Sequence, residues 1–164
     1  MGKVILICGR IGAGKTTYAA ELIRQTNAVN ISQDELMLAL FGPGLYERDP
    51  QKYGEYCMVV EDYVKRKAGE AAKAGAVVIC ENGFWSRAER DELKKFYAGM
   101  GVSCELHYID TPQGRRIENI NKRNGEIKRG KQHFFLTSEV DINHFFEAPD
   151  DDEIDFKVTW ENSK

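Results

Sequence analysis

The chain has 164 residues, of which 42% are hydrophobic and 30% charged, and these values are typical of a single globular domain. The formal net charge of −3 argues against long DNA or RNA as a partner, because nucleic-acid-binding domains usually carry a basic excess. No apolar stretch reaches the roughly 18 residues of a membrane span, and no cationic leader is visible. We therefore expect a cytoplasmic protein without a membrane partner, and its four scattered cysteines are expected to be reduced thiols that bind no metal.

Short apolar runs alternate with amphipathic segments along the chain. Strands are predicted over residues 4–8, 29–32, 77–80, 104–109 and 155–160. Helices are predicted from residue 15 and over residues 35–41, 50–74, 86–99, 111–124 and 138–146. This alternation predicts a three-layer α/β fold of one domain over residues 1–164, with a mainly parallel sheet flanked by helices.

The turn after the first strand fits the pattern G-x-x-x-x-G-K-[ST]. The phosphate-binding segment predicted from it is Gly9, Arg10, Ile11, Gly12, Ala13, Gly14, Lys15, Thr16 and Thr17. Glycines allow a tight turn whose N–H groups converge on a phosphate, and the following helix directs its positive end at the same place. Lys15 would reach the β- and γ-phosphates of ATP, and the Thr16 hydroxyl would be a ligand of Mg²⁺.

Later motifs separate the classes of P-loop protein. A GTPase would need an N-K-x-D motif, whereas residues 121–124 read N-K-R-N inside a predicted helix. The chain resembles the zeta-toxin-like and polynucleotide-kinase-like branch of P-loop kinases, through G-R-I-G-A-G-K-T, I-S-Q-D-E-L, V-V-I-C-E-N-G-F-W-S-R-A-E-R-D, H-Y-I-D-T-P and N-K-R-N. This resemblance implies a P-loop NTPase fold, a phosphoryl-transfer reaction and a small lid, here at about residues 115–132.

Asp34 follows the second predicted strand, where open α/β sheets bind their ligands. The resemblance implies that Asp34 takes the proton from the acceptor hydroxyl, or that it orients Mg²⁺. An alternative is that Asp34 caps the helix that follows, because aspartate is favoured at that position.

Glu81, Arg87 and Arg90 follow the third strand and are candidates for binding the acceptor. Related kinases usually carry aspartate near the position of Glu81. The two arginines lie in the first turn of a predicted helix, where the positive helix end disfavours them. Such a placement suggests a functional purpose, such as binding an anionic acceptor or the transferred phosphate, although exposed surface arginines remain an alternative.

Arg123 is the candidate lid arginine that the resemblance implies, and a guanidinium is suited to stabilise the charge that shifts during transfer. Family members often carry a second arginine one turn earlier, but that position is Asn119, so Arg116 is the candidate substitute. Gly125 and Gly130 would bracket a basic loop able to close over the nucleotide.

These observations predict an ATP- and Mg²⁺-dependent kinase that transfers the γ-phosphate to a hydroxyl of a small acceptor. Lys15, Asp34 and Arg123 would be its catalytic residues. A nucleoside, a nucleotide, a sugar nucleotide and an antibiotic are all compatible acceptors. Two alternatives remain, namely a nucleotide-binding regulatory module without transfer activity and a 5′-polynucleotide kinase.

Overall fold

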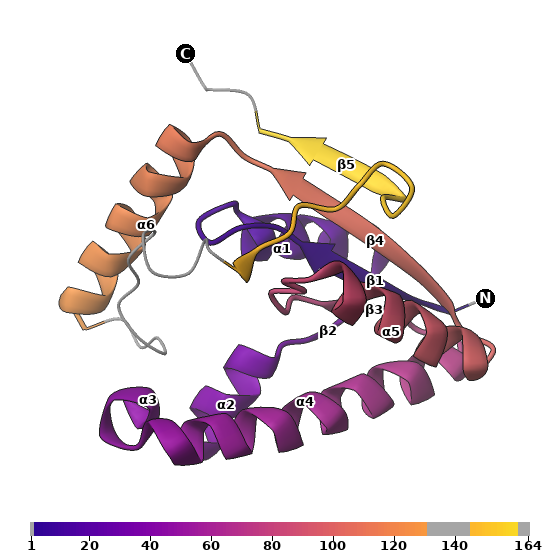
Figure 1. Ribbon diagram of the computed structural model, residues 1–164, viewed down its shortest axis with the longest axis horizontal. Helices are drawn as coiled ribbons and strands as arrows, with labels where there is room; N and C mark the ends of the chain where they lie inside the picture. The colour runs from indigo at the N-terminus through magenta and orange to yellow at the C-terminus, as the bar shows by residue number, and fades with distance from the viewer. Residues whose placement is uncertain (1, 131–144, 161–164) are drawn as a thin grey trace.

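A computed structural model of the chain describes residues 2–130 and 145–160. Its centre is a five-stranded sheet in the order β2-β3-β1-β4-β5, in which each neighbouring pair is parallel (Figure 1). The strands are β1 (Lys3–Cys8), β2 (Val29–Ile31), β3 (Val77–Cys80), β4 (Ser103–Asp110) and β5 (Phe156–Thr159). The helices are α1 (Lys15–Thr26), α2 (Gln33–Phe41), α3 (Leu45–Arg48), α4 (Pro50–Lys73), α5 (Arg87–Gly99) and α6 (Gln113–Lys128).

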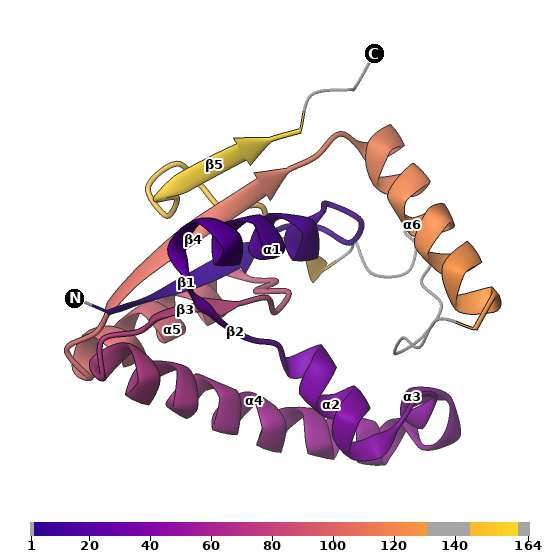
Figure 2. The same ribbon diagram turned by 180° about the vertical axis from the view of Figure 1, so that it is seen from behind.

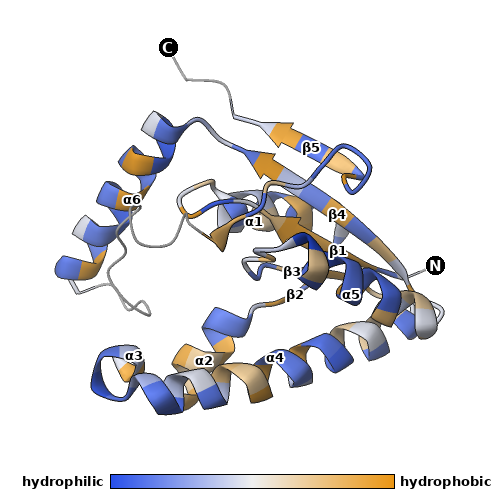
Figure 3. Ribbon diagram, viewed as in Figure 1, coloured by the Kyte–Doolittle hydropathy of each residue, from blue (hydrophilic) through white to orange (hydrophobic). Residues whose placement is uncertain are grey.

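The central strands are buried on both faces, as expected for a parallel sheet between helices. Alternate side chains of β1 enter two different clusters: Val4 and Leu6 pack with α4 and α5, whereas Ile5 and Ile7 pack with α1. The view from behind shows α1 alone across its face of the sheet (Figure 2). Hydropathy follows the same division, because the central strand is mostly apolar and the outer surfaces of α5 and α6 are mostly hydrophilic (Figure 3).

Local signals account for the helix boundaries. Pro50 opens α4 behind Asp49, whose side chain accepts a hydrogen bond from the Lys52 N–H at 3.1 Å. Ser86 caps α5 by accepting from the Glu89 N–H at 3.2 Å. The Glu89 carboxylate in turn accepts at 2.8 Å from the backbone N–H of Trp85, the residue before the cap.

The predicted α/β class and parallel sheet are confirmed, and two details differ. The four-residue helix α3 was not predicted, because a single turn carries no periodic pattern. Helix α6 continues through Gly125 to Lys128, so the basic loop predicted to begin at Gly125 is wrong over those residues. The predicted helix over 138–146 lies, as far as residue 144, outside the described residues. None of the helices that are described could span a lipid bilayer.

Candidate active site

The loop between β1 and α1 has the backbone that its glycines predict. Gly12 and Gly14 both have left-handed backbone angles, with φ of 76° and 95°. A Cβ on Gly12 would lie only 2.5 Å from the Arg116 carbonyl oxygen, so α6 leaves no space for a side chain there. Ala13 is buried and Ile11 is half-buried, while Thr16 and Thr17 are exposed in the first turn of α1. The Thr16 side chain is therefore accessible to a ligand at the N-terminus of α1.

Lys15 lies at the centre of the charges around this loop. Its Nζ donates to the carbonyls of Gly9 at 2.8 Å and Arg10 at 3.3 Å. Burial lowers the pKa of Lys15, and the carboxylates of Asp34 and Glu81 partly counteract this. The carboxylates that follow β2 and β3 therefore lie close enough to the P-loop to influence its lysine.

Asp34 is not the cap of α2. That position belongs to Ser32, whose Oγ accepts a hydrogen bond from the Glu35 N–H at 3.3 Å. Asp34 lies in the first turn and is exposed, yet partial desolvation of its carboxylate raises its pKa, while Lys15 and Arg123 counteract the rise. Capping therefore does not explain this aspartate, which faces the two cations predicted to bind phosphate.

Arg123 projects from α6 toward the same charges. Burial lowers the pKa of Arg123, and Asp34 opposes that effect. Its Nε and Nη2 atoms are buried and have no hydrogen-bond partner within residues 2–130 and 145–160. A desolvated guanidinium without acceptors is costly, and an anion with several oxygens would satisfy it.

Side-chain amides that the sequence did not single out lie beside the carboxylates. Asn30 on β2 donates its Nδ2 to Glu81 Oε1 at 2.7 Å. Asn82 donates to Gln33 Oε1 at 2.9 Å, and Gln33 donates to the Cys57 carbonyl at 3.2 Å. The position of Asn82 directly after a buried strand was the available signal, whereas nothing in the pattern marked Asn30 or Gln33.

Arg87 and Arg90 contact the acidic segment, residues 147–155, in the structure. Arg90 Nε binds Glu153 Oε2 at 2.7 Å, with the two side chains only 1% and 4% exposed. Arg87 forms ion pairs with Asp150 at 2.9 Å and Asp152 at 2.6 Å. The anions that neutralise these arginines thus come from the chain itself, and their predicted contact with the acceptor stays a prediction.

The residue just before the acidic segment contacts the P-loop. Phe146 is buried, and its ring centroid lies 4.9 Å from the guanidinium carbon of Arg10. Its ring also meets Trp85 edge to face, with 6.0 Å between the ring centroids. These contacts link the P-loop, the start of α5 and the acidic segment.

Two side chains connect α6 to the P-loop by hydrogen bonds. One lies on the helix and the other lies just before the helix begins. Asn119 Nδ2 donates to the Gly12 carbonyl at 2.8 Å, and Thr111 Oγ1 donates to the Ala13 carbonyl at 2.8 Å. The buried Arg116 donates through Nε to the Thr111 carbonyl at 3.2 Å. Asn119 therefore contributes to the shape of the loop.

The residues present fit a magnesium ion bound together with a nucleotide. Among the described residues no group of three or more His, Cys, Asp or Glu side chains could hold a metal. Magnesium commonly uses few protein ligands and takes the rest from phosphates and water. Thr16 could supply a hydroxyl oxygen, and Asp34 and Glu81 could bind its coordinated water.

Comparisons with known proteins agree with this arrangement. The family model described as an AAA domain matches residues 4–140. Among curated proteins no match is found. A provisionally assigned kinase from Chloroflexus aurantiacus superposes with a TM-score of 0.72 at 15% identity, covering 96% of this chain and 88% of that one.

Two further similar structures are those of kinases. The Mycobacterium tuberculosis APS kinase, in complex with AMPPNP and APS, has a TM-score of 0.63 at 20% identity and covers 99% of this chain and 90% of its own. Shikimate kinase from Aquifex aeolicus has a TM-score of 0.57 at 19% identity, with coverage of 98% and 87%. At these identities the likeness concerns the fold, which is that of P-loop kinases.

Proposed function

Because this chain belongs to the AAA-domain family and has the fold of P-loop kinases, we propose that it transfers the γ-phosphate of ATP to a hydroxyl of a small acceptor. The observation that carries the proposal is that Asp34 lies near enough to both Lys15 and Arg123 for each of these cations to lower its pKa against the effect of burial. Two cations predicted to bind phosphate lie beside a carboxylate with no capping role. Such a set matches the needs of phosphoryl transfer, which depends on positioning and charge stabilisation.

Each residue has a separate task in this mechanism. The P-loop N–H groups and Lys15 would bind the β- and γ-phosphates, and Lys15 would exchange its carbonyl partners for phosphate oxygens. Asp34 would accept the proton of the acceptor hydroxyl, for which its raised pKa makes it a better base than an ordinary aspartate. Arg123 would donate hydrogen bonds to the oxygens of the transferred group. Thr16 would hold a magnesium ion, which would supply positive charge to the phosphates.

The test replaces Asp34 with asparagine, and Glu35→Gln in the same helical turn is the matched control. Transfer of label from γ-labelled ATP to a panel of nucleosides, sugars, sugar nucleotides and antibiotics is measured beside ATP binding. We expect D34N to lose roughly 10²- to 10⁴-fold in transfer rate while it binds ATP like the wild type.

Other results would change the proposal. Full transfer by D34N would remove Asp34 as the base. ATP binding that requires Lys15, together with no transfer to any acceptor, would favour the nucleotide-binding regulatory module. Labelling of short oligonucleotides in preference to small acceptors would favour the 5′-polynucleotide kinase.

A further inference from the structure

The acceptor rim, defined as Asn30, Gln33, Asp34, Glu81 and Asn82, follows from the parallel register of β2 and β3. Ile31 pairs with Cys80, so the residues after both strands emerge at the same edge of the sheet. Hydrogen bonds connect Asn30 with Glu81 and Gln33 with Asn82. Asp34 adjoins Gln33 in the first turn of α2. These side chains therefore form one polar surface beside the P-loop.

Charge on this rim is negative. The cations that influence Asp34 are Lys15 and Arg123, and both have tasks on the ATP side of the proposed reaction. Arg87 and Arg90 follow β3 and would be the next candidates to neutralise an anionic acceptor at the rim. Both are engaged by carboxylates of the acidic segment. An anionic acceptor would thus meet the carboxylates of Asp34 and Glu81, while the two cations that influence Asp34 are assigned to ATP.

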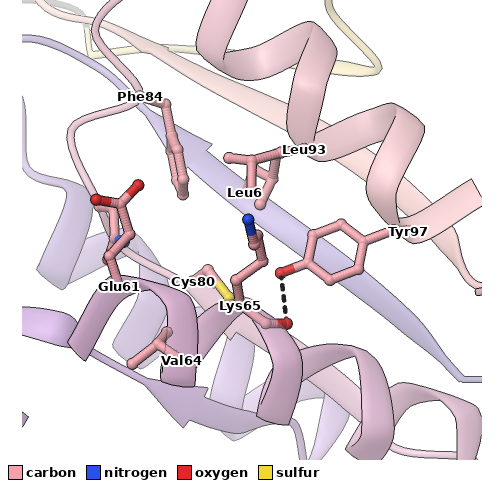
Figure 4. A pocket seen from close by; sticks show the side chains of 9 residues that line it. Leu6, Glu61, Val64, Lys65, Cys80, Phe84, Leu93 and Tyr97 are labelled. Atoms are coloured by element: carbon pink, nitrogen blue, oxygen red, sulfur yellow. Dashed lines mark hydrogen bonds between the residues drawn. The ribbon is translucent and has the colours of Figure 1, made fainter. Parts of the chain in front are cut away.

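The amides on the rim add hydrogen-bond acceptors rather than donors. Asn30 uses its Nδ2 on Glu81, and its Oδ1 is buried without a donor in the described part of the chain. The Oδ1 of Asn82 is likewise buried without a hydrogen-bond donor among the described residues. Asn82, however, also lines a cavity of about 10 Å³ between α4 and α5 (Figure 4), which has room for about one water. Asn30 is therefore the firmer indication that the rim requires donors from a ligand.

We propose that the acceptor is a small polyhydroxyl compound without phosphate or carboxylate groups, either uncharged or carrying an amine. This inference rests on the proposed function. The hydroxyl or ammonium groups of such a compound would donate to Asn30 Oδ1 and to the Glu81 carboxylate, and they would place a neighbouring hydroxyl beside Asp34. Phosphate esters and sugar acids would instead bring like charge to the rim, which is unfavourable in a partly desolvated site.

The experiment uses acceptors that differ mainly in charge. Transfer from γ-labelled ATP is measured with glucosamine, glucose and gluconate, and separately with adenosine and 3′-AMP, which share a free 5′-hydroxyl. We expect kcat/KM in each active set to be at least about tenfold higher for the uncharged or cationic member than for the anionic one, since a charged group left unpaired costs more than the hydrogen bond it replaces.

A variant tests the source of the preference. Glu81→Gln keeps an oxygen able to accept from Asn30 but removes the charge, so the advantage of glucosamine over glucose should fall by about tenfold, the usual weight of one charge-assisted hydrogen bond. Glu21→Gln on the exposed surface of α1 is the matched control and should leave the ratio unchanged.

The outcomes separate this inference from the proposed function. Preferential transfer to gluconate or 3′-AMP would overturn the inference and leave the kinase intact. An unchanged acceptor ratio in Glu81→Gln would also overturn it. Transfer to no member of either set would reject the acceptor class proposed here, while ATP binding by wild type and Lys15→Ala would report independently on the nucleotide site.

Discussion

Two regions of the molecule hold arginine nitrogens away from solvent, and they differ in whether those nitrogens have hydrogen-bond partners. At the start of α5, Arg90 has a complete set of partners: the Glu153 carboxylate and the carbonyls of Phe84 and Glu147. On α6, Arg123 has buried nitrogens without a hydrogen-bond partner among the described residues. An arginine whose charge is already satisfied holds segments together, whereas an arginine left unsatisfied is suited to a ligand.

The largest expected effect concerns Arg123. Replacing it with methionine should lower kcat by roughly 10³-fold or more, the usual weight of an arginine that stabilises transferred phosphate. Because its buried nitrogens lack described partners, the free energy of unfolding should stay equal or rise. Phosphate transfer and urea denaturation measure the two effects. Arg115→Met, at an exposed site on the same helix, is the control, and a large loss of stability in R123M would contradict this assignment.

Arg90→Met should show the reverse pattern. It leaves the buried Glu153 with only Arg87, whose Nη1 lies 3.9 Å away, and removing one partner of a buried pair typically costs about 3–5 kcal/mol in the free energy of unfolding. The folded fraction should still transfer phosphate at a rate within a few-fold of the wild type. Denaturation and active-site-normalised kinetics measure this, and a stable R90M protein with impaired acceptor binding would return Arg90 to the substrate site.

The pH profile sharpens the role of Asp34. A general base must be deprotonated, and desolvation raises the pKa of Asp34 above its ordinary value. Activity should therefore fall, as pH decreases, at a pH above the usual titration of aspartate near 4. Measuring kcat as a function of pH would show this fall in activity. Circular dichroism at each pH would distinguish it from acid unfolding. A rate that is constant down to pH 4 would contradict the prediction.

The smallest effect is expected at Arg87, which contacts the same acidic segment as Arg90 but is much less buried. Arg87→Gln removes ion pairs with Asp150 and Asp152, but solvent and salt screen such pairs. Any change in melting temperature should be small and should vanish in about 0.5 M salt, where the Debye length is only a few ångströms. A loss of acceptor affinity instead would show that Arg87 can leave its carboxylates.

The sequence predicted the sheet and the phosphate loop because both depend on local signals. The apolar run of β3 and the glycine pattern before Lys15 need no knowledge of distant residues. Gly125 was misleading, since a single glycine is tolerated within a helix and α6 passes through it.

The arginines of α5 show what local signals leave out. Their unfavourable position was interpreted as a sign of an anionic acceptor or of the transferred phosphate, whereas the carboxylate that binds Arg90 in the structure belongs to Glu153, 63 residues away along the chain. No local pattern distinguishes such an internal partner from a ligand. The capping of α2 depended on a similar ambiguity, because both Ser32 and Asp34 are good capping residues and only the backbone decides between them.

The separation of Arg90 and Glu153 also has a consequence during protein synthesis. At ribosomal rates of roughly 5–20 residues per second, Glu153 is made about 3 to 13 seconds after Arg90. The β1–β3 pairing and α5 can form earlier, so the growing chain passes through a stage in which the guanidinium still requires water. The ion pair between Arg90 and Glu153 then forms late, by closure of a long loop, and nascent chains stalled before residue 153 should be more sensitive to proteases than completed ones.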